Sequence, residues 1–346
     1  MGEFLSTPDK TKESFDNENE FLRFGSCGMQ GWRKRMEDAH ISDISQGDQK
    51  QYQIFGVFDG HGGKEVSQFV KAHFTKEFLN NQNLKKGDVQ KALTETFFKM
   101  DDLMREAQGK IELREFAKKS KEEDDIQNAK NPNQNSQNEL ISKLLSQQKG
   151  ENEEVALMTG CTACVCVIDT LKKKLYFANA GDSRVVLCKK GQAYPMSLDH
   201  KPENEIEKNR IYKADGWISE GRVKGNLNLS RGLGDLEYKQ NAKLPPEEQM
   251  ITANPDIKIE ELDKDCDFIV LGCDGIWDCL TNQEACDYVK NDLKISGENT
   301  KLSGILEKML DSICATDIYN ETGVGCDNMT CLIVQFKKNN IINIKV

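Results

Sequence analysis

Three aspartates in this chain share one local sequence pattern. Asp59, Asp274 and Asp327 each lie at the edge of a predicted strand, and each precedes glycine or asparagine. Carboxylates in tight turns at strand ends can converge at one end of a sheet, and ligand sets made only of oxygen suit Mg²⁺ or Mn²⁺. A single Asp-Gly pair is more simply a turn, because aspartate favours turn geometry. Spacing alone therefore leaves both interpretations open.

A second group of residues with metal-ligand character is Cys161, Cys164 and Cys166. On a β-strand, Cys164 and Cys166 would share one face and Cys161 would point to the other. No paired Cys-x-x-Cys motif completes a ligand set elsewhere in the sequence. We therefore expect these thiols to pack in the core.

Eight blocks of the sequence together resemble the PPM family, the metal-dependent protein phosphatases of type 2C. They occur in the family's order and cover about residues 20–336, apart from one polar stretch. Any one block is only suggestive, whereas eight in order make coincidence negligible. The blocks are GMQGWRKRMEDAH (Gly28–His40), FGVFDGHGG (Phe55–Gly63), TGCTA (Thr159–Ala163), ANAGDSRVV (Ala178–Val186), LDHKP (Leu198–Pro202), NLSRGLGD (Asn228–Asp235), FIVLGCDGIWD (Phe268–Asp278) and GCDNMTC (Gly325–Cys331).

The resemblance implies a centre with two divalent cations, Mg²⁺ or Mn²⁺. Asp59 matches the carboxylate that bridges the two cations. Gly60 matches the residue whose backbone carbonyl oxygen binds one of them. Asp274 and Asp327 match the carboxylates that complete the second cation's site.

Four further residues match functional positions of the family. Glu37 and Asp38 resemble the acidic pair that holds water around the cations, a role that residues beyond the direct ligands commonly have. Arg33 matches the arginine that binds the substrate phosphate, a task suited to a planar guanidinium group. His61 matches the general acid that protonates the leaving alkoxide.

The sequence departs from the family pattern at a third, weaker cation site. Family members often place an aspartate three residues before the glycine of the TGCTA block, together with a partner that matches Asp278. In this chain that position is Leu157. Glu153 or Glu154 could substitute, so the resemblance leaves the third site open.

The elements that must position these residues are short strands and amphipathic helices. Alone they indicate only an α+β protein, whereas the resemblance implies an α-β-β-α sandwich of two antiparallel β-sheets flanked by helices, with the cations at one end. Apolar periodicity predicts helices over Lys64–Leu79, Asp88–Ala107 and Lys301–Thr316, and a capping box predicts another that starts at Thr281–Glu284. Strands are predicted over Tyr52–Phe58, Cys161–Ile168, Lys174–Ala178, Arg184–Cys188, Asp267–Cys273 and Met329–Phe336.

Composition divides the chain into one domain and three polar segments. We expect a loosely held N-terminal arm (1–20), a phosphatase domain (21–338) and a C-terminal tail (339–346). The domain is interrupted at about 108–154 by an insertion dominated by Lys, Glu, Asn and Gln. Such a composition buries too little apolar surface to offset its ordering entropy. We expect this insertion to be flexible or helical and to contribute nothing to the core.

Charge and hydropathy limit the partners. The formal net charge is −10, which disfavours nucleic acid as a ligand. No apolar run is long enough to span a bilayer, and the N-terminus lacks a signal-peptide pattern. We expect a cytoplasmic, monomeric protein with phosphoprotein substrates. The first six residues fit the N-myristoylation pattern at Gly2, with an ordinary unmodified N-terminus as the alternative.

The sequence thus favours hydrolysis of phosphoserine and phosphothreonine in proteins by a water activated at a binuclear Mg²⁺ or Mn²⁺ site. One alternative is a phosphohydrolase of the same mechanism that acts on small phosphate esters. Another is a catalytically silent binding module, which would be favoured if a cation-binding carboxylate were replaced. None of the matched carboxylates is replaced.

Overall fold

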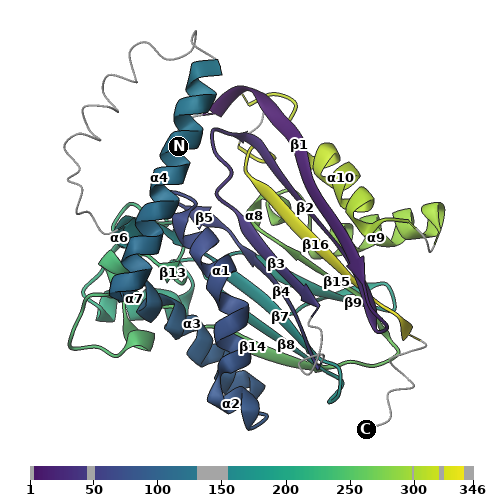
Figure 1. Ribbon diagram of the computed structural model, residues 1–346, viewed down its shortest axis with the longest axis horizontal. Coiled ribbons are helices and arrows are strands. Elements are labelled where there is room, and N and C mark those ends of the chain that lie inside the picture. Colours follow the sequence, from purple (N-terminus) through teal and green to yellow (C-terminus); the bar gives the residue numbers. More distant parts are fainter. Residues whose placement is uncertain (1–3, 45–50, 131–154, 298–299, 319–322, 339–346) are drawn as a thin grey trace.

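Two antiparallel β-sheets form the centre of the protein (Figure 1). The computed structural model describes residues 4–44, 51–130, 155–297, 300–318 and 323–338. The six-stranded sheet has the order β1 (Phe4–Glu18), β2 (Leu22–Arg33), β16 (Met329–Phe336), β15 (Cys266–Gly272), β9 (Arg184–Lys189) and β10 (Gln192–Pro195). The five-stranded sheet has the order β14 (Asp256–Glu261), β8 (Lys174–Ala180), β7 (Ala163–Asp169), β4 (Tyr52–Phe58) and β3 (Ala39–Ile44).

Helices cover the outer face of each sheet, which confirms the predicted α-β-β-α sandwich (Figure 1). The five-stranded sheet packs against α1 (Glu65–Asn80) and α3 (Val89–Arg105), with α2 (Gln82–Lys85) and α4 (Ala107–Lys130) beside them. The six-stranded sheet packs against α9 (Asn282–Ser296) and α10 (Leu302–Ile313). Shorter elements surround the end of the sheets: α6 (Val155–Met158), α7 (Glu205–Lys213), α8 (Asp274–Trp277), the 3₁₀ turns η3 (Leu236–Lys239) and η4 (Pro246–Glu248), and strands β5 (Gly60–His61), β6 (Gly160–Cys161), β11 (Ile218–Ser219), β12 (Arg222–Val223) and β13 (Leu233–Gly234).

The central strands are mostly apolar on both faces because both faces are covered. In β4, Phe55 and Val57 pack between the sheets, whereas Ile54 and Phe58 pack toward α1 and α3. The cysteines follow the same rule. Cys164 and Cys166 lie in the cluster between the sheets and Cys161 lies in the helix-facing cluster, which confirms their predicted role in core packing.

The predicted strands and helices correspond to observed elements. Tyr52–Phe58 and Met329–Phe336 have the observed bounds of β4 and β16. The capping box is present at α9, where Thr281 accepts from the backbone N–H of Glu284 and the Glu284 carboxylate accepts from the backbone N–H of Thr281. No helix within the described ranges combines the length and apolar character needed to cross a bilayer.

The expectation of a loosely held N-terminal arm is wrong for residues 4–18. These residues form β1, an edge strand that pairs with β2 from Phe4 opposite Arg33 to Glu18 opposite Arg23. A hydropathy pattern does not reveal this strand, because its side chains are polar. Backbone hydrogen bonds, and not buried side chains, hold it in the sheet. The pairing register shifts between Phe4 and Lys12, around Pro8, which cannot donate a ladder hydrogen bond.

The expectation that the insertion contributes nothing to the core is also wrong for its first part. Residues 107–130 form α4, in which Leu113 is buried and Phe116 packs against the same cluster as α1 and α3. His73 on α1 also contacts Glu112, with 2.8 Å between Nε2 and the carboxylate. The rest of the insertion, 131–154, and the predicted tail 339–346 lie outside the described residues.

Candidate active site

The three aspartates singled out from the sequence come together at one end of the sandwich. Asp59 follows β4, Asp274 begins α8 just after β15, and Asp327 lies two residues before the start of β16. Strands β15 and β16 are antiparallel neighbours, so the end of one meets the beginning of the other, with Gly272 opposite Cys331. Strand topology therefore brings together carboxylates that are far apart in the sequence.

Two glycines allow the loops at this end to meet. A Cβ atom at Gly60 would lie 2.3 Å from the carbonyl oxygen of Glu37. A Cβ atom at Gly275 would lie 2.1 Å from the carbonyl oxygen of Asn328. Any side chain at either position would push the acidic loops apart. The glycine of each Asp-Gly pair is thus required by close backbone approach.

The residues around these carboxylates do not supply enough positive charge or hydrogen-bond donors to balance their negative charge. Asp38 is buried, and neither of its oxygens has a hydrogen-bond partner among the described residues. Burial raises the pKa of Asp38 to about 6, with Asp327 adding to the rise. Burial and the nearby Asp274 carboxylate raise the pKa of Asp59 well above its usual range. Buried acids in this state require a cation or a proton.

The donor atoms fit a hard divalent cation. Oxygens of Asp38 and Asp59 lie with the Cys273 sulfur within 4.8 Å of one another. Burial raises the pKa of the Cys273 thiol well above its usual value, so it remains protonated. It accepts a hydrogen bond from the N–H of Thr330 at 3.2 Å. This leaves an oxygen-only ligand set, which is the kind that Mg²⁺ and Mn²⁺ prefer.

Arg33, at the end of β2, reaches this acidic cluster. Its Nη2 donates to Oδ2 of Asp327 at 2.6 Å, while Oδ1 of Asp327 accepts from the backbone N–H of Asn328 at 2.7 Å. The Arg33 Nε is buried and has no hydrogen-bond partner in the described part of the chain. The guanidinium group therefore keeps donor capacity beside the carboxylates.

His61 is held by a residue to which the sequence analysis assigned no role. Strands β5, β6 and β13 form a small sheet in which His61 lies opposite Gly160, and Gly160 lies opposite Gly234. The next residue, Asp235, is buried and accepts from His61, with 2.8 Å between Nε2 and Oδ2. Burial alone lowers the pKa of His61, but the Asp235 carboxylate outweighs it and the pKa is raised.

Asn328 was likewise missed as a positioning residue. Its side-chain amide donates to the carbonyl oxygens of Gln30 and Arg35 at 2.8 and 2.9 Å, and its oxygen accepts from the N–H of Glu37 at 2.9 Å. Asn328 therefore ties the β2–β3 loop to the Asp327 turn. The signal available from the sequence was its place directly after Asp327 in the GCDNMTC block.

Two basic residues next to the site pair with acidic residues near the end of α4. Arg35 makes a two-pronged contact with Asp124, at 3.1 Å from Nε and 2.5 Å from Nη2. Lys64, just before α1, pairs with Glu123. The helix that the sequence analysis treated as peripheral thus borders the predicted active site.

The position at which the resemblance places a carboxylate for a third cation is occupied by Leu157. Leu157 lies in α6 and packs partly buried against the apolar cluster of α1 and α3. Asp278 is the residue that ends α8, and burial raises its pKa. The candidate substitutes Glu153 and Glu154 lie outside the described residues.

One alternative phosphatase chemistry is excluded by geometry. Cys27 and Arg33 have the Cys-x5-Arg spacing used by cysteine-dependent phosphatases. Both lie in strand β2, where six residues span about 20 Å instead of folding around one phosphate. Burial also raises the pKa of the Cys27 thiol to about 11, so it is protonated and weakly nucleophilic at neutral pH.

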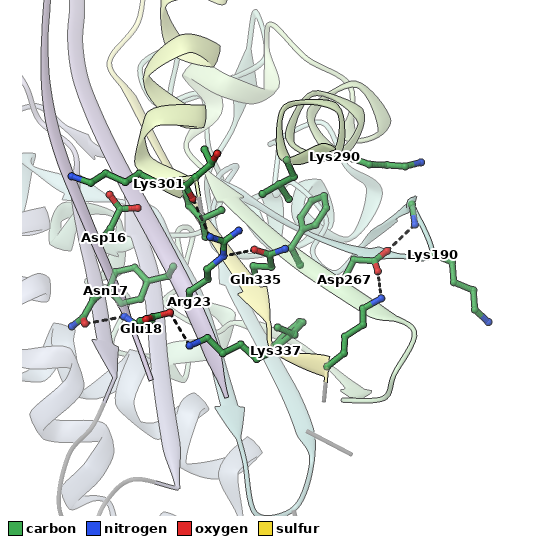
Figure 2. A pocket seen from close by; sticks show the side chains of 18 residues that line it. Asp16, Asn17, Glu18, Arg23, Lys190, Asp267, Lys290, Lys301, Gln335 and Lys337 are labelled. Atoms are coloured by element: carbon green, nitrogen blue, oxygen red, sulfur yellow. Dashed lines mark hydrogen bonds and ion pairs between the residues drawn. The ribbon is translucent and has the colours of Figure 1, made fainter. Parts of the chain in front are cut away.

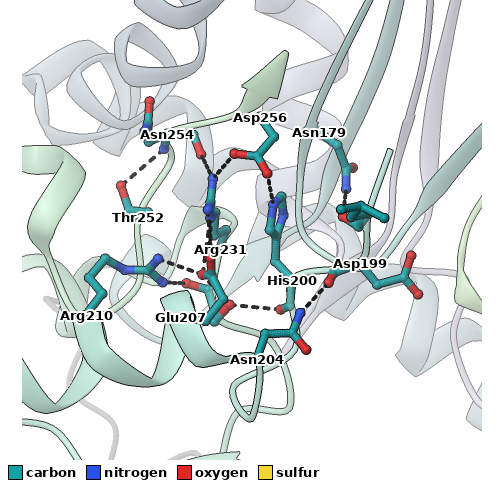
Figure 3. Close-up of polar contacts among 12 residues, drawn as sticks. Asn179, Asp199, His200, Asn204, Glu207, Arg210, Arg231, Thr252, Asn254 and Asp256 are labelled. Carbon is teal, nitrogen blue, oxygen red and sulfur yellow. Dashed lines mark hydrogen bonds and ion pairs between the residues drawn. The ribbon is translucent and has the colours of Figure 1, made fainter. Parts of the chain in front are cut away.

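A charge network that is buried at Glu207, Arg231 and His200 and exposed at Asp256 connects several segments (Figure 3). Glu207 on α7 accepts from Arg231 and Arg210, each at 2.6 Å. Arg231 also donates to Asp256 at 2.8 Å, and Asp256 contacts Nε2 of His200 at 3.1 Å. The network joins α7, the start of β14 and the chain that leads into Asp235.

Comparisons with known proteins show the family of this chain. A family model described as protein phosphatase 2C matches residues 22–111 and 107–320. An Arabidopsis thaliana protein named "Probable protein phosphatase 2C 21" is 45% identical over 342 residues, covering 98% of this chain and 94% of its own length. A Paramecium tetraurelia protein named "Probable protein phosphatase 2C 6" is 42% identical over 338 residues, covering 97% and 100%.

The fold also matches solved structures. A phosphatase from Toxoplasma gondii aligns with a TM-score of 0.67 at 20% identity, covering 95% of this chain and 96% of that one. A serine-threonine phosphatase 2C from the same organism aligns with a TM-score of 0.66 at 16% identity, covering 94% and 100%. The chain belongs to the protein phosphatase 2C family. It is a metal-dependent serine/threonine protein phosphatase that acts on phosphoproteins.

Proposed function

We propose that two divalent cations, Mg²⁺ or Mn²⁺, are held by Asp59, the carbonyl oxygen of Gly60, Asp274 and Asp327. The observation that carries this proposal is the unpartnered, buried carboxylate of Asp38 beside the half-buried Asp59 and Asp274, whose pKa values are both raised. When bound, the cations neutralise the charge of the phosphate ester and activate a water for attack on phosphorus. Glu37 and Asp38 accept hydrogen bonds from water around the cations.

The other proposed roles belong to Arg33 and His61. Arg33 binds the phosphate oxygens of the substrate through the donor capacity that Asp327 leaves free. His61 donates a proton to the serine or threonine oxygen as it leaves. Asp235 favours the protonated imidazole and fixes its orientation.

Several expectations remain proposals about the whole protein. The third cation, if it binds, would use Asp278. N-myristoylation at Gly2 would add marginal, reversible membrane binding, and Gly2 lies outside the described residues. We also propose a cytoplasmic location and a monomeric state.

The test of the metal centre is the Asp59→Asn variant combined with chelation. We expect the variant to lose nearly all activity on a phosphothreonine peptide and to bind Mn²⁺ much more weakly by calorimetry, with an unchanged circular dichroism spectrum. EDTA should inactivate the parent protein and Mn²⁺ should restore it. Full activity after dialysis into excess chelator would contradict the proposal.

A further inference from the structure

A large groove lies at the end of the six-stranded sheet that is opposite to the active site (Figure 2). It is lined by Asp267 and Phe268 at the start of β15, whereas Asp274 lies just beyond the end of that strand. Seven residues of extended chain separate the two sites by about 20 Å. The groove is therefore distinct from the metal centre.

The size of the groove suits a stretch of polypeptide. Its volume is about 1210 Å³, above the range of about 300–1,000 Å³ typical of small-molecule pockets. Side chains of Phe24, Leu302 and Phe336 contribute to its floor and are themselves almost fully buried. An occupant would thus gain most of its contact from polar and charged groups at the rim.

The charge of the groove is opposite to that of the whole chain. Six cationic side chains line it, namely Arg23, Lys190, Lys290, Lys301, Lys337 and Lys338, against three acidic ones, Asp16, Glu18 and Asp267. The formal net charge of the protein is −10. A concentration of positive charge on such a protein marks a surface that attracts anionic partners.

The acidic side chains of the groove are already engaged. Glu18 pairs with Lys337 at 2.7 Å, and Asp267 pairs with Lys338 at 2.5 Å. Asp16 accepts from the backbone N–H of Ser303 at 3.0 Å. Two of the three carboxylates are therefore already paired with cations, as is Lys190, which contacts Asp265 at 2.7 Å.

Two lysines are left without such partners. Within the described part of the chain, Lys290 on α9 and Lys301 before α10 form no ion pair or side-chain hydrogen bond, and Figure 2 shows them on opposite sides of the groove. Arg23, between them at the centre, donates to the neutral groups Gln335 Oε1 and Thr300 O at 2.5 and 3.0 Å. A chain that crosses the groove would meet all three.

We propose that this groove docks an acidic segment of a phosphoprotein substrate, rich in Asp and Glu and separate from the phosphorylated residue. Carboxylates of the segment would pair with Lys290 and Lys301. Docking would raise the effective concentration of the phosphorylated residue at the distant active site. The proposal rests on the protein phosphatase activity but not on any particular role within the metal centre.

The test is direct binding of a fluorescein-labelled peptide of Asp, Glu and Leu to the full chain, followed by fluorescence anisotropy. We expect Lys290→Glu/Lys301→Glu to weaken binding about tenfold or more, because two attractive contacts become repulsive. Affinity should fall as salt rises. A peptide of equal length with Asn and Gln in place of the acids should bind poorly.

Kinetics separate docking from catalysis. A phosphothreonine peptide carrying the acidic segment should show a raised KM with the double variant and an unchanged kcat. Turnover of p-nitrophenyl phosphate should stay as in the parent. Lys85→Glu/Lys86→Glu, which makes the same charge change at exposed sites at the end of α2, is the matched control.

Three outcomes would overturn the proposal. One is equal affinity of the parent and the Lys290→Glu/Lys301→Glu variant. Another is an equal loss in the Lys85→Glu/Lys86→Glu control, which would indicate general charge attraction. The third is self-association of the parent that the groove variant abolishes, which would make a second copy the occupant.

Discussion

At the scale of single residues, His61 and Asp235 allow acid catalysis to be separated from metal binding. The imidazole contacts a buried carboxylate at 2.8 Å, so a protonated ring is favoured beside the cation ligands. An alkoxide is a poor leaving group and needs a proton, whereas nitrophenolate leaves without one. The contribution of His61 to the reaction rate should therefore depend on the leaving group of the substrate.

We expect His61→Gln to lower kcat on a phosphothreonine peptide by about 10²–10⁴-fold, the usual contribution of a positioned acid. The same variant should lose much less activity on p-nitrophenyl phosphate and should bind Mn²⁺ with nearly unchanged affinity. Equal losses on both substrates, or recovery of the rate by extra Mn²⁺, would instead assign His61 to the metal site.

The raised pKa of Asp38 predicts how the stability of the metal-free protein depends on pH. Its pKa rises from an ordinary value near 3.8 to about 6 on folding. The folded state thus holds the proton more tightly, and this contribution to stability is complete below pH 4 and lost as pH rises through 6. The loss is about 3 kcal/mol at 1.36 kcal/mol per pKa unit.

In EDTA, the free energy of unfolding should therefore fall as pH rises from about 4 to about 6, as followed by urea denaturation. Asp38→Asn should make this dependence shallower, and Mn²⁺ should reverse it in the parent. The slope will not vanish, because Asp59 and Asp274 have raised pKa values for the same reason. An identical slope in the variant would show that Asp38 is not a proton-binding acid.

At the scale of elements, α4 shows how a polar segment can belong to the core. Its composition is polar, yet Leu113 is only 1% exposed and packs against the helices that cover the five-stranded sheet. If the segment were peripheral, replacing residues 112–150 by a Gly/Ser linker would leave the stability of the domain unchanged. We expect this replacement to destabilise the domain.

Single substitutions on α4 test this more sharply. Leu113→Ala should cost about 2–5 kcal/mol of stability, as for other large-to-small changes in a core. Ile111→Ala, two residues away on the same helix, is the matched control because Ile111 is 47% exposed. That change should stay within about 0.5 kcal/mol of the parent in urea denaturation. Similar small costs for both would mean that α4 is not anchored.

At the scale of the whole molecule, the Glu207 network holds together segments that no single element connects. Burial alone would raise the pKa of Glu207, but Arg231 and Arg210 outweigh it and lower the pKa to about 2. An acid whose pKa is lowered by folding stabilises the fold at pH values above the pKa that it has in the unfolded chain. This stabilisation is lost as pH falls. The relevant window is therefore from about pH 4.5 down to about pH 2.

We expect Glu207→Gln to destabilise the protein at neutral pH by about 3–5 kcal/mol, because it leaves two buried guanidinium groups without their carboxylate. The fall in stability between about pH 4.5 and 2 should become shallower than in the parent. Glu205→Gln, on the same helix but exposed, is the control. An unchanged acid limb of the stability curve would remove Glu207 as its cause.

Local pattern was enough to predict most of the central strands and the capped helix α9, whereas the convergence of the acidic motifs was predicted only through the family resemblance. Strands such as β4 and β16 are mostly apolar on both faces, so they appear in the sequence as apolar runs with few polar residues. Glycines and asparagine beside Asp59, Asp274 and Asp327 are local requirements of tight approach, so they also appear in the sequence. Family resemblance then supplied the pairing of the two sheets.

Other features exist only because distant segments meet. Strand β1 is polar and is held by the backbone of β2, and the contact of His61 with Asp235 joins residues 174 positions apart. The groove assembles the ends of four strands with the edges of α9 and α10. The sequence by itself determined which residues could do the chemistry. Only the tertiary structure decided which of them touch. Backbone pairing at a sheet edge and charge pairs between remote segments produce no periodic pattern in the sequence, so they cannot be predicted from it.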